Sequence, residues 1–345
     1  MIHARFLDEH LEDALAVMAD MVIHPTFAEA DLEREVVAEE INMYEDSPSE
    51  LIADNLTEAI FDGHPLGKSV LGTMEVIESV TLDQVRSYHQ SHYRLPNMVV
   101  AAAGNVEHDE LTELASVYLA TGNGARAEAP GTGELPAATS AAARFTRKET
   151  QQYHVSFGGL GVHRQDERRF ALSILDGILG GSASSRLFQE VRDKRGLAYS
   201  VYSYSTAYSD SGLIGVYFGS RAESVGEITR IVVNQLRSIM EDGVTEKELH
   251  RAKENAKGRL VLGMETTHNR MSRLGKLSVT DAAILDLDEL IARVEAVTAA
   301  EVKDLARELY QPDRLTAVGI GPDAGVFEEA MEILGGERLL TVKEA

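Results

Sequence analysis

The chain has 345 residues, a length typical of two domains, and its hydrophobic fraction of 44% is ample for packed cores. It carries 33 basic and 56 acidic residues, and the formal net charge of −23 disfavours binding to nucleic acid and to anionic membranes. Cysteine is absent, which excludes disulfides and cysteine-based metal sites, so any metal must be held by His, Asp and Glu. No apolar run approaches the roughly 18 residues that span a bilayer.

The first part of the chain shows the pattern of a series of amphipathic helices. Its opening residues lack the uninterrupted apolar core of a signal peptide. Apolar residues recur at helical spacing from Asp8 to about Ile23, and the pattern predicts further helices over 28–44, 49–61, 81–93 and about 107–119. Thr81 is the predicted N-cap of the helix over 81–93. The sequence HPLG at 64–67 predicts a turn, and the apolar run 97–106 predicts a buried strand.

A change of composition separates this part from the rest. Residues 121–150 are rich in Gly, Ala, Pro, Ser and Thr, which is typical of a linker. After them, alternating or apolar runs predict strands over 151–160, 197–208, 211–220 and 314–321, the middle two as an antiparallel pair. Helical periodicity predicts helices over about 166–179, 183–193, 222–241, 245–262 and 286–309.

An internal repeat relates the two parts. Residues 80–104 match 297–321 at a constant separation of 217 residues, with four pairs of identical residues at the same spacing: Thr81 and Thr298, Val85 and Val302, Tyr93 and Tyr310, and Gly104 and Gly321. The separation indicates that the first part lacks about 65 to 70 residues at its beginning, because the strand that starts the second part has no counterpart.

We therefore predict an α+β fold of two tandem homologous domains. Each would pack helices on a mostly antiparallel sheet, and the first would lack its front. The predicted limits are 1–122 for the N-terminal domain, 123–149 for the linker and 150–345 for the C-terminal domain.

The helix predicted over 28–44 carries two carboxylates that are candidate site residues. Glu33 and Glu40 are seven residues apart, which places them on one face together with Val37 and Tyr44. Carboxylates on a half-buried stripe are costly unless they are paired or bind a cation. Glu is also a good helix former, and the spacing alone favours a solvated acidic helix.

Several collinear segments resemble the pitrilysin (insulinase) family of zinc metallopeptidases, which includes the mitochondrial processing peptidase. The first part carries EREVVAEEINMYEDSP (33–48), HPLGKSVLGTMEVIESVT (64–81) and HYRLPNMVVAAAGNVEHDEL (92–111). The second part carries FALSILDGILGGSASSRLFQEVRDKRGLAYSVYS (170–203), GVTEKELHRAKENAKGRL (243–260) and METTHNRMSRLG (264–275). Together these matches cover almost everything outside the predicted linker.

The resemblance implies roles for four residues. Glu40 corresponds to the family's third zinc ligand, and Glu33 to the carboxylate that supports the site. Glu39 is adjacent, but the seven-residue spacing to Glu33 favours Glu40. Arg192 and Tyr199 match the family's Arg/Tyr pair, in which a guanidinium and a phenol stabilise the oxyanion of peptide hydrolysis and hold the substrate. Without the resemblance, Tyr199 would be interpreted as a packing residue and Arg192 as a surface charge.

The sequence departs from the family at its metal-binding motif, His-x-x-Glu-His on a helix. Residues 7–10 read LDEH, but Phe6 stands where the first His is required, and His3 and His10 are seven residues apart. His89 and His92 are interpreted as ordinary helix residues, and His268 receives no role. Because the motif precedes the Glu ligand in the family, its expected place falls before Met1. Zn²⁺, one per complete site, is therefore not expected to be held by this chain alone.

The resemblance implies a zinc-dependent metalloendopeptidase that hydrolyses peptides or unfolded segments enclosed between two domains. The alternative is a non-catalytic partner or scaffold subunit of the same family, which gains support if Met1 is the true start. In either case we expect a homodimer or a heterodimer with a family member, with neither nucleic acid nor membrane as a partner. The cysteine-free, acidic composition favours the cytoplasm.

Overall fold

The computed structural model describes residues 1–119 and 141–344, and these form two compact units. Among the described residues, the first unit comprises 1–40, 73–119 and 260–285, and the second comprises 41–72, 141–259 and 286–344. Neither unit is a contiguous stretch of chain.

Helices dominate the part before residue 120. In chain order they are η1 (Asp8–His10), α1 (Leu11–Ile23), α2 (Ala30–Glu45), α3 (Pro48–Ile60), η2 (Pro65–Gly67), α4 (Met74–Ser79), α5 (Leu82–His92), η3 (Leu95–Asn97) and α6 (His108–Tyr118). The predicted helices are confirmed to within two residues at each end, and the predicted HPLG turn is the short 3₁₀ helix η2.

The part after residue 140 mixes strands and helices. Its strands are β1 (Ala143–Arg147), β2 (Tyr153–Leu160), β3 (Ala198–Ala207), β4 (Gly212–Ser220), β5 (Thr316–Gly321) and β6 (Leu340–Glu344). Its helices are α7 (Arg169–Leu179), the π-helix η4 (Phe188–Asp193), α8 (Ala222–Glu241), α9 (Glu246–Gly263), α10 (Thr267–Val279), α11 (Leu287–Ala296), α12 (Ala299–Leu309), η5 (Pro312–Arg314) and α13 (Ala324–Leu334).

One six-stranded sheet, in the order β3-β4-β2-β5-β1-β6, forms the centre of the second unit. β3, β4, β2 and β5 are antiparallel neighbours, whereas β1 lies parallel to both β5 and β6. The predicted antiparallel pair at 197–220 is confirmed as β3 and β4. A mostly antiparallel sheet covered by helices also confirms the predicted α+β class.

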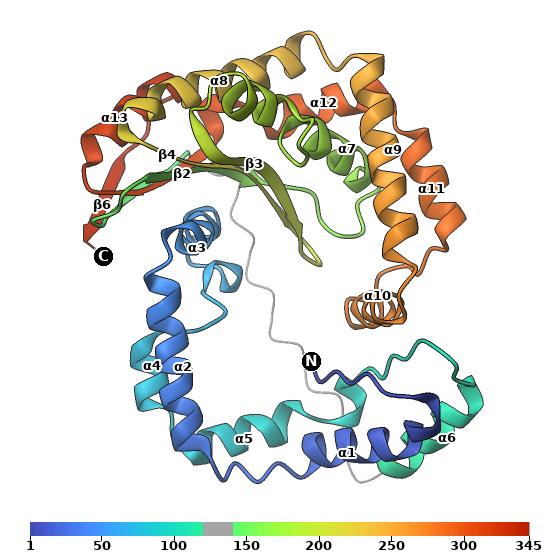
Figure 1. The fold of residues 1–345 in the computed structure, drawn as a ribbon. Helices are drawn as coiled ribbons and strands as arrows, with labels where there is room; N and C mark the ends of the chain where they lie inside the picture. Colours follow the sequence, from blue (N-terminus) through green and yellow to red (C-terminus); the bar gives the residue numbers. More distant parts are fainter. Residues whose placement is uncertain (120–140, 345) are drawn as a thin grey trace. The chain divides into compact units, whose positions relative to one another are not determined.

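Both faces of this sheet are covered. On one face lie α7, α8, α12 and α13, which contact one another and the strands (Figure 1). On the other face lies α3, whose Ile52, Leu56 and Ile60 pack against Leu213 and Ile320 of the sheet. A Cβ atom at Gly158 would lie 2.8 Å from Leu56, so glycine on β2 permits this close approach. A helix from the first part of the sequence thus completes the core of the second unit.

The internal repeat extends to the structure. α5 and α12 begin 217 residues apart and have the same length, and so do η3 and η5. Thr81 and Thr298 are the N-caps of α5 and α12, each in a capping box with the residue three positions on, Gln84 or Glu301. The predicted Thr81 cap is confirmed. The repeat also pairs α1 with α8, α2 with α9, α3 with α10, α4 with α11 and α6 with α13 in the same order.

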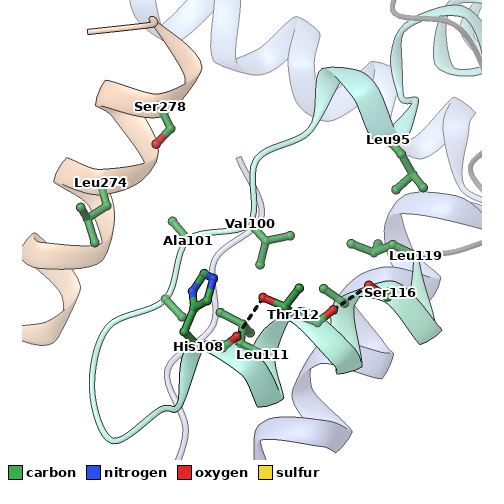
Figure 2. Close-up of a pocket in the computed structure, with 12 residues that line it drawn as sticks. Leu95, Val100, Ala101, His108, Leu111, Thr112, Ser116, Leu119, Leu274 and Ser278 are labelled. Carbon is green, nitrogen blue, oxygen red and sulfur yellow. Dashed lines mark hydrogen bonds between the residues drawn. The ribbon is translucent and has the colours of Figure 1, made fainter. Parts of the chain in front are cut away.

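The strand predicted over 97–106 is wrong. Residues 98–103 adopt no regular structure (Figure 2), and Val99 and Val100 remain 43% and 44% exposed. The equivalent residues of the second part form β5, which is buried between β1 and β2. A strand needs a hydrogen-bonded neighbour, and no described residue supplies one to 98–103. The apolar pattern of this segment is therefore typical of a strand, but no described residue pairs with its backbone.

Other boundaries also differ from prediction. The single helix predicted over 286–309 is two helices, because Thr298 caps a new one. The helix predicted over 183–193 is confirmed from 186 onward, most of it as the π-helix η4. Of the predicted linker 123–149, the residues up to 140 lie outside the described part and Ala143–Arg147 is β1. The limits of the two domains stay a prediction.

None of the helices in the described part of the chain combines the length and the apolar composition that crossing a bilayer requires.

Candidate functional site

Two local irregularities of the backbone lie next to each other in the second unit. The π-helix η4 carries Arg192 in its last turn, and the chain then reverses at Gly196, whose φ of +62° suits glycine. β3 follows and is one edge of the sheet. Its register against β4 shifts between Ala198 and Ser200, so Tyr199 is the extra residue of a β-bulge. Both irregularities are enriched at functional sites because they redirect side chains.

These irregularities bring Arg192 and Tyr199 together. The Arg192 guanidinium donates a hydrogen bond to the Tyr199 carbonyl oxygen at 3.1 Å, and its Cζ lies 4.2 Å from the centre of the Tyr199 ring. The same Cζ lies 4.9 Å from the centre of the Phe188 ring. The cation thus contacts two aromatic rings, which restricts its position.

Tyr199 itself faces solvent. Its side chain is 74% exposed, and its hydroxyl makes no hydrogen bond to any described residue. An exposed large aromatic residue at a bulge is a poor packing residue. The interpretation of Tyr199 as part of a packed core is therefore not supported by its surroundings. The phenol O–H and the remaining guanidinium N–H groups are available as donors to an external oxygen.

A partly buried ion pair holds the segment that leads into η4. Arg186 Nε and Nη2 donate to the two carboxylate oxygens of Glu248 at 2.7 and 2.9 Å. The second oxygen also accepts from the Thr245 N–H and hydroxyl at 2.8 Å each. Burial raises the pKa of Glu248, but the hydrogen bonds from Arg186 and Thr245 outweigh it and lower the pKa to about 2. The pair anchors the residues before η4 to the start of α9.

A second, partly buried carboxylate lies against the same sheet. Ser203 Oγ donates to Asp176 Oδ1 at 2.5 Å, and the pair joins β3 to the end of α7. Gly180 makes this possible, since a Cβ there would lie 2.1 Å from the Ser203 nitrogen. Burial raises the pKa of Asp176 to about 6, although the Ser203 hydrogen bond and the charge of Arg259 act in the opposite direction.

The two candidate carboxylates of α2 lie in a different environment from those of Glu248 and Asp176. Glu33 and Glu40 are both exposed, as is Glu39. No ion pair involves either of them within 1–119 and 141–344. This environment matches the solvated acidic helix, and their roles as metal ligand and supporting carboxylate stay a prediction. So does their convergence with Arg192 and Tyr199, which belong to the other unit.

The histidines give no metal centre either. His89 is half-buried, and its Nε2 lies 2.8 Å from the Val22 carbonyl oxygen, in keeping with a structural role. His3 and His268 were not predicted to meet, yet His268 Nδ1 lies 3.0 Å from His3 Nε2. Their separation of 265 residues left no signal in the sequence. Among the described residues, no three or more His, Cys, Asp and Glu side chains form a group that could hold a metal ion.

Comparisons with known proteins place the chain in a family. Residues 79–256 match the model of the "Peptidase M16 inactive domain", and residues 1–74 match that of the "Insulinase (Peptidase family M16)". The chain is 39% identical over 322 residues to the uncharacterized zinc protease YmxG of Bacillus subtilis, and the match covers 92% of this chain and 77% of the relative. The chain belongs to the M16 (insulinase) family. The predicted resemblance is thereby confirmed.

Further relatives support the membership. An uncharacterized zinc protease of Streptomyces coelicolor is 38% identical, with 89% of this chain and 68% of the relative covered. An M16 inactive domain from Pseudomonas fluorescens superimposes with a TM-score of 0.80 at 25% identity, covering 92% of this chain and 76% of that one. A protease from Helicobacter pylori shares the fold with a TM-score of 0.84 at 21% identity, covering 91% and 77%.

The names of the M16 relatives associate the family with zinc. The donor set found here does not fit a zinc ion. Structural and catalytic zinc sites need three or four convergent protein ligands, and the described residues contain no such group. The described residues of this M16 chain do form the Arg192–Tyr199 pair and the contacts that position it.

Proposed function

We propose that this M16 chain acts in the hydrolysis of peptides or unfolded protein segments, and that Arg192 and Tyr199 contact the peptide. The observation that supports the proposal is the convergence of a π-helix and a β-bulge on these two side chains, with the guanidinium in contact with two aromatic rings and the Tyr199 side chain exposed. Irregular backbone costs free energy, so its occurrence at both residues favours a functional reason.

The chemistry of the pair suits this role. Attack on a peptide carbonyl places negative charge on its oxygen, and a phenol O–H together with a guanidinium N–H stabilises that charge. The stacking on Phe188 and the hydrogen bond to the Tyr199 carbonyl fix the guanidinium in advance, so little reorganisation is needed when the charge develops. The same donors bind the carbonyl groups of an extended peptide.

For zinc, the proposal names two carboxylates of this chain. Glu40 stays our candidate for one zinc ligand and Glu33 for its supporting carboxylate. The imidazole ligands implied by the M16 family are not assembled among the described residues, and Glu40 by itself is too few ligands for a catalytic zinc ion.

The first test is cleavage of a quenched fluorescent peptide without secondary structure. We expect Tyr199→Phe to lower kcat/KM by about 100-fold, since removing one donor to an oxyanion costs that much in known enzymes. Arg192→Ala should lower it at least as far. The preparation assayed is whichever is active: the chain alone, or the chain mixed with an active M16 peptidase.

Tyr202→Phe serves as the matched control, because Tyr202 lies on the same strand, is 40% exposed, and has no predicted role. It should leave kcat/KM unchanged. Equal activity of Tyr199→Phe and the parent chain would refute the proposed role of the pair.

The alternative function is a non-catalytic subunit that lends Arg192 and Tyr199 to a partner. The observation that favours it is that the pair is assembled, whereas the described residues gather no set of metal ligands. Zinc content and mixing distinguish the two functions. Stoichiometric zinc with chelator-sensitive cleavage by the chain alone supports the peptidase. Activity gained only on mixing with an active M16 member supports the partner subunit, and absence of both leaves only a shared fold.

Assembly and location follow as parts of the same proposal. We infer a homodimer or a heterodimer with another M16 chain. We also infer a cytoplasmic location from the acidic, cysteine-free composition.

A further inference from the structure

Three cations lie close together in the segment that joins Arg192 to Tyr199. Arg192, Lys194 and Arg195 fall within four residues, and like charges at this spacing repel one another. Of the three, Arg192 is the one whose guanidinium contacts the Tyr199 ring and its carbonyl oxygen. Other contacts must therefore hold the remaining two cations away from the phenol.

Glu190 binds both of the remaining cations. Lys194 Nζ donates to Glu190 Oε1, and Arg195 Nη1 donates to Glu190 Oε2 at 2.6 Å. Both carboxylate oxygens are thus occupied, and the Glu190 side chain is only 23% exposed, so the three residues form a network rather than an isolated surface pair. The hydrogen bonds from Lys194 and then from Arg195 lower the pKa of Glu190, and its carboxyl group is ionised at neutral pH.

The backbone of Glu190 takes part in the same contacts. The last carbonyl groups of a helix need partners from outside its regular hydrogen-bond pattern. The Glu190 carbonyl oxygen accepts from Arg195 Nη1 at 2.8 Å, so one guanidinium joins the main chain and the side chain of Glu190. The chain then turns, and the Gly196 N–H donates to the Arg192 carbonyl oxygen at 3.0 Å. Glu190 therefore holds the turn against η4 at two points.

We propose that Glu190 is a positioning residue for the Arg192–Tyr199 pair. By holding Lys194 and Arg195 against η4, it leaves Arg192 as the cation of this turn that meets a peptide carbonyl group. The inference rests on the proposed function of the pair. It goes beyond that function because it gives a role to a side chain whose hydrogen bonds go to neither member of the pair.

The first test compares Glu190→Gln with Glu227→Gln in the peptide-cleavage assay described for Tyr199→Phe. Both variants remove one carboxylate beside Arg195, but Glu227 Oε1 lies 3.9 Å from Arg195 Nε and its side chain is 50% exposed. We expect Glu190→Gln to lower kcat/KM about tenfold, mainly through kcat, because a displaced guanidinium stabilises the developing charge less well. Glu227→Gln should leave kcat/KM unchanged.

A second test needs no peptidase activity. In the full chain labelled with ¹⁵N-arginine, the ring currents of Phe188 and Tyr199 should shift the NMR signal of the Arg192 Nε–H group. The absence of this signal in Arg192→Lys assigns it. Glu190→Gln should move the signal toward the position of free arginine, whereas Glu227→Gln should leave it in place.

A third variant removes the partners instead of Glu190. Lys194 and Arg195 have side chains that are 60% and 40% exposed, so Lys194→Gln/Arg195→Gln should fold even if Glu190→Gln does not, and urea denaturation checks this. This variant should displace the Arg192 signal as Glu190→Gln does. Adding Glu190→Gln to it should lower kcat/KM no further, because the cations that Glu190 holds are already gone.

The failure of this inference differs from the failure of the proposed function. If Tyr199→Phe lowers kcat/KM while Glu190→Gln and Glu227→Gln are equally active, the function of the pair stands and the role of Glu190 is overturned. If Tyr199→Phe leaves kcat/KM unchanged, the proposed function fails. An Arg192 signal that Glu190→Gln does not move would overturn the positioning role in either case.

Discussion

Identical residues at equivalent positions of the repeat have different surroundings. Tyr93 and Tyr310 are 217 residues apart in matching segments, yet Tyr93 is 51% exposed whereas Tyr310 is only 1% exposed. The Tyr310 hydroxyl has no hydrogen-bond partner among the described residues. Burial also raises its pKa well above the ordinary value. A buried hydroxyl without a partner costs free energy, which makes this residue a direct test of the packing.

We expect Tyr310→Phe to raise the free energy of unfolding by about 1 kcal/mol, because the variant keeps the ring and removes the unpaired hydroxyl. Urea denaturation followed by circular dichroism measures the change in midpoint. Tyr93→Phe is the matched control and should have no effect. A loss of stability in Tyr310→Phe would show that the hydroxyl does have a partner in solution.

Asp176 gives a pH dependence whose sign follows from its pKa. Burial raises the pKa of this carboxyl to about 6, above its ordinary value of 3.8. Between these values the unfolded chain releases the proton while the folded chain keeps it, so the free energy of unfolding falls as pH rises. Each pKa unit corresponds to about 1.4 kcal/mol, so the effect is on the order of 2 kcal/mol between pH 4 and 7.

Asp176→Asn removes this contribution and keeps an acceptor for Ser203. Relative to the parent chain, the variant should gain stability steadily from pH 4 to pH 7, as measured by the denaturation midpoint at each pH. Asp288→Asn, an equal change of charge at an exposed position of α11, should show no such trend. A constant difference between parent and Asp176→Asn across this range would contradict the raised pKa.

At the scale of elements, the Arg186–Glu248 pair connects the approach to η4 with the start of α9. Both side chains are mostly buried, with 15% and 18% exposed. Removing one partner leaves a buried charge without compensation. We expect Glu248→Gln to lower the free energy of unfolding by about 3 kcal/mol at pH 7.

The double variant Arg186→Leu/Glu248→Leu should recover part of this loss, because it removes both charges together. A double-mutant cycle of Arg186→Leu, Glu248→Leu and this double variant, measured by urea denaturation, gives the coupling. If Glu248→Gln is as stable as the parent chain, the pair does not anchor this segment.

Strand formation shows how far an element depends on its neighbours. Residues 98–103 and β5 have the same apolar pattern, but only β5 has partner strands. Helices differ, because their hydrogen bonds close within the element and their caps are local. This is why most helix limits and the Thr81 cap followed from the sequence, whereas the strand at 97–106 did not.

At the scale of the whole molecule, the two compact units do not coincide with the two halves of the repeat. α3 belongs by sequence to the first half and packs on the sheet of the second unit, and α10 belongs to the second half and lies in the first unit. The repeat thus exchanges one equivalent helix in each direction. Hydrophobic periodicity shows that a helix has an apolar face but carries no information about which sheet will cover it.

The sequence by itself determined the α+β class, most of the helices with the Thr81 cap, the repeat and the M16 family, because these depend on local periodicity and on runs of residues along the chain. It also pointed to Arg192 and Tyr199, seven residues apart. Only the tertiary structure decided that a π-helix and a bulge stack these side chains, that Tyr310 is buried and Asp176 partly buried, and that 98–103 is unpaired among the described residues. These outcomes depend on irregular backbone geometry or on contacts between segments, and neither leaves a periodic trace in a single sequence.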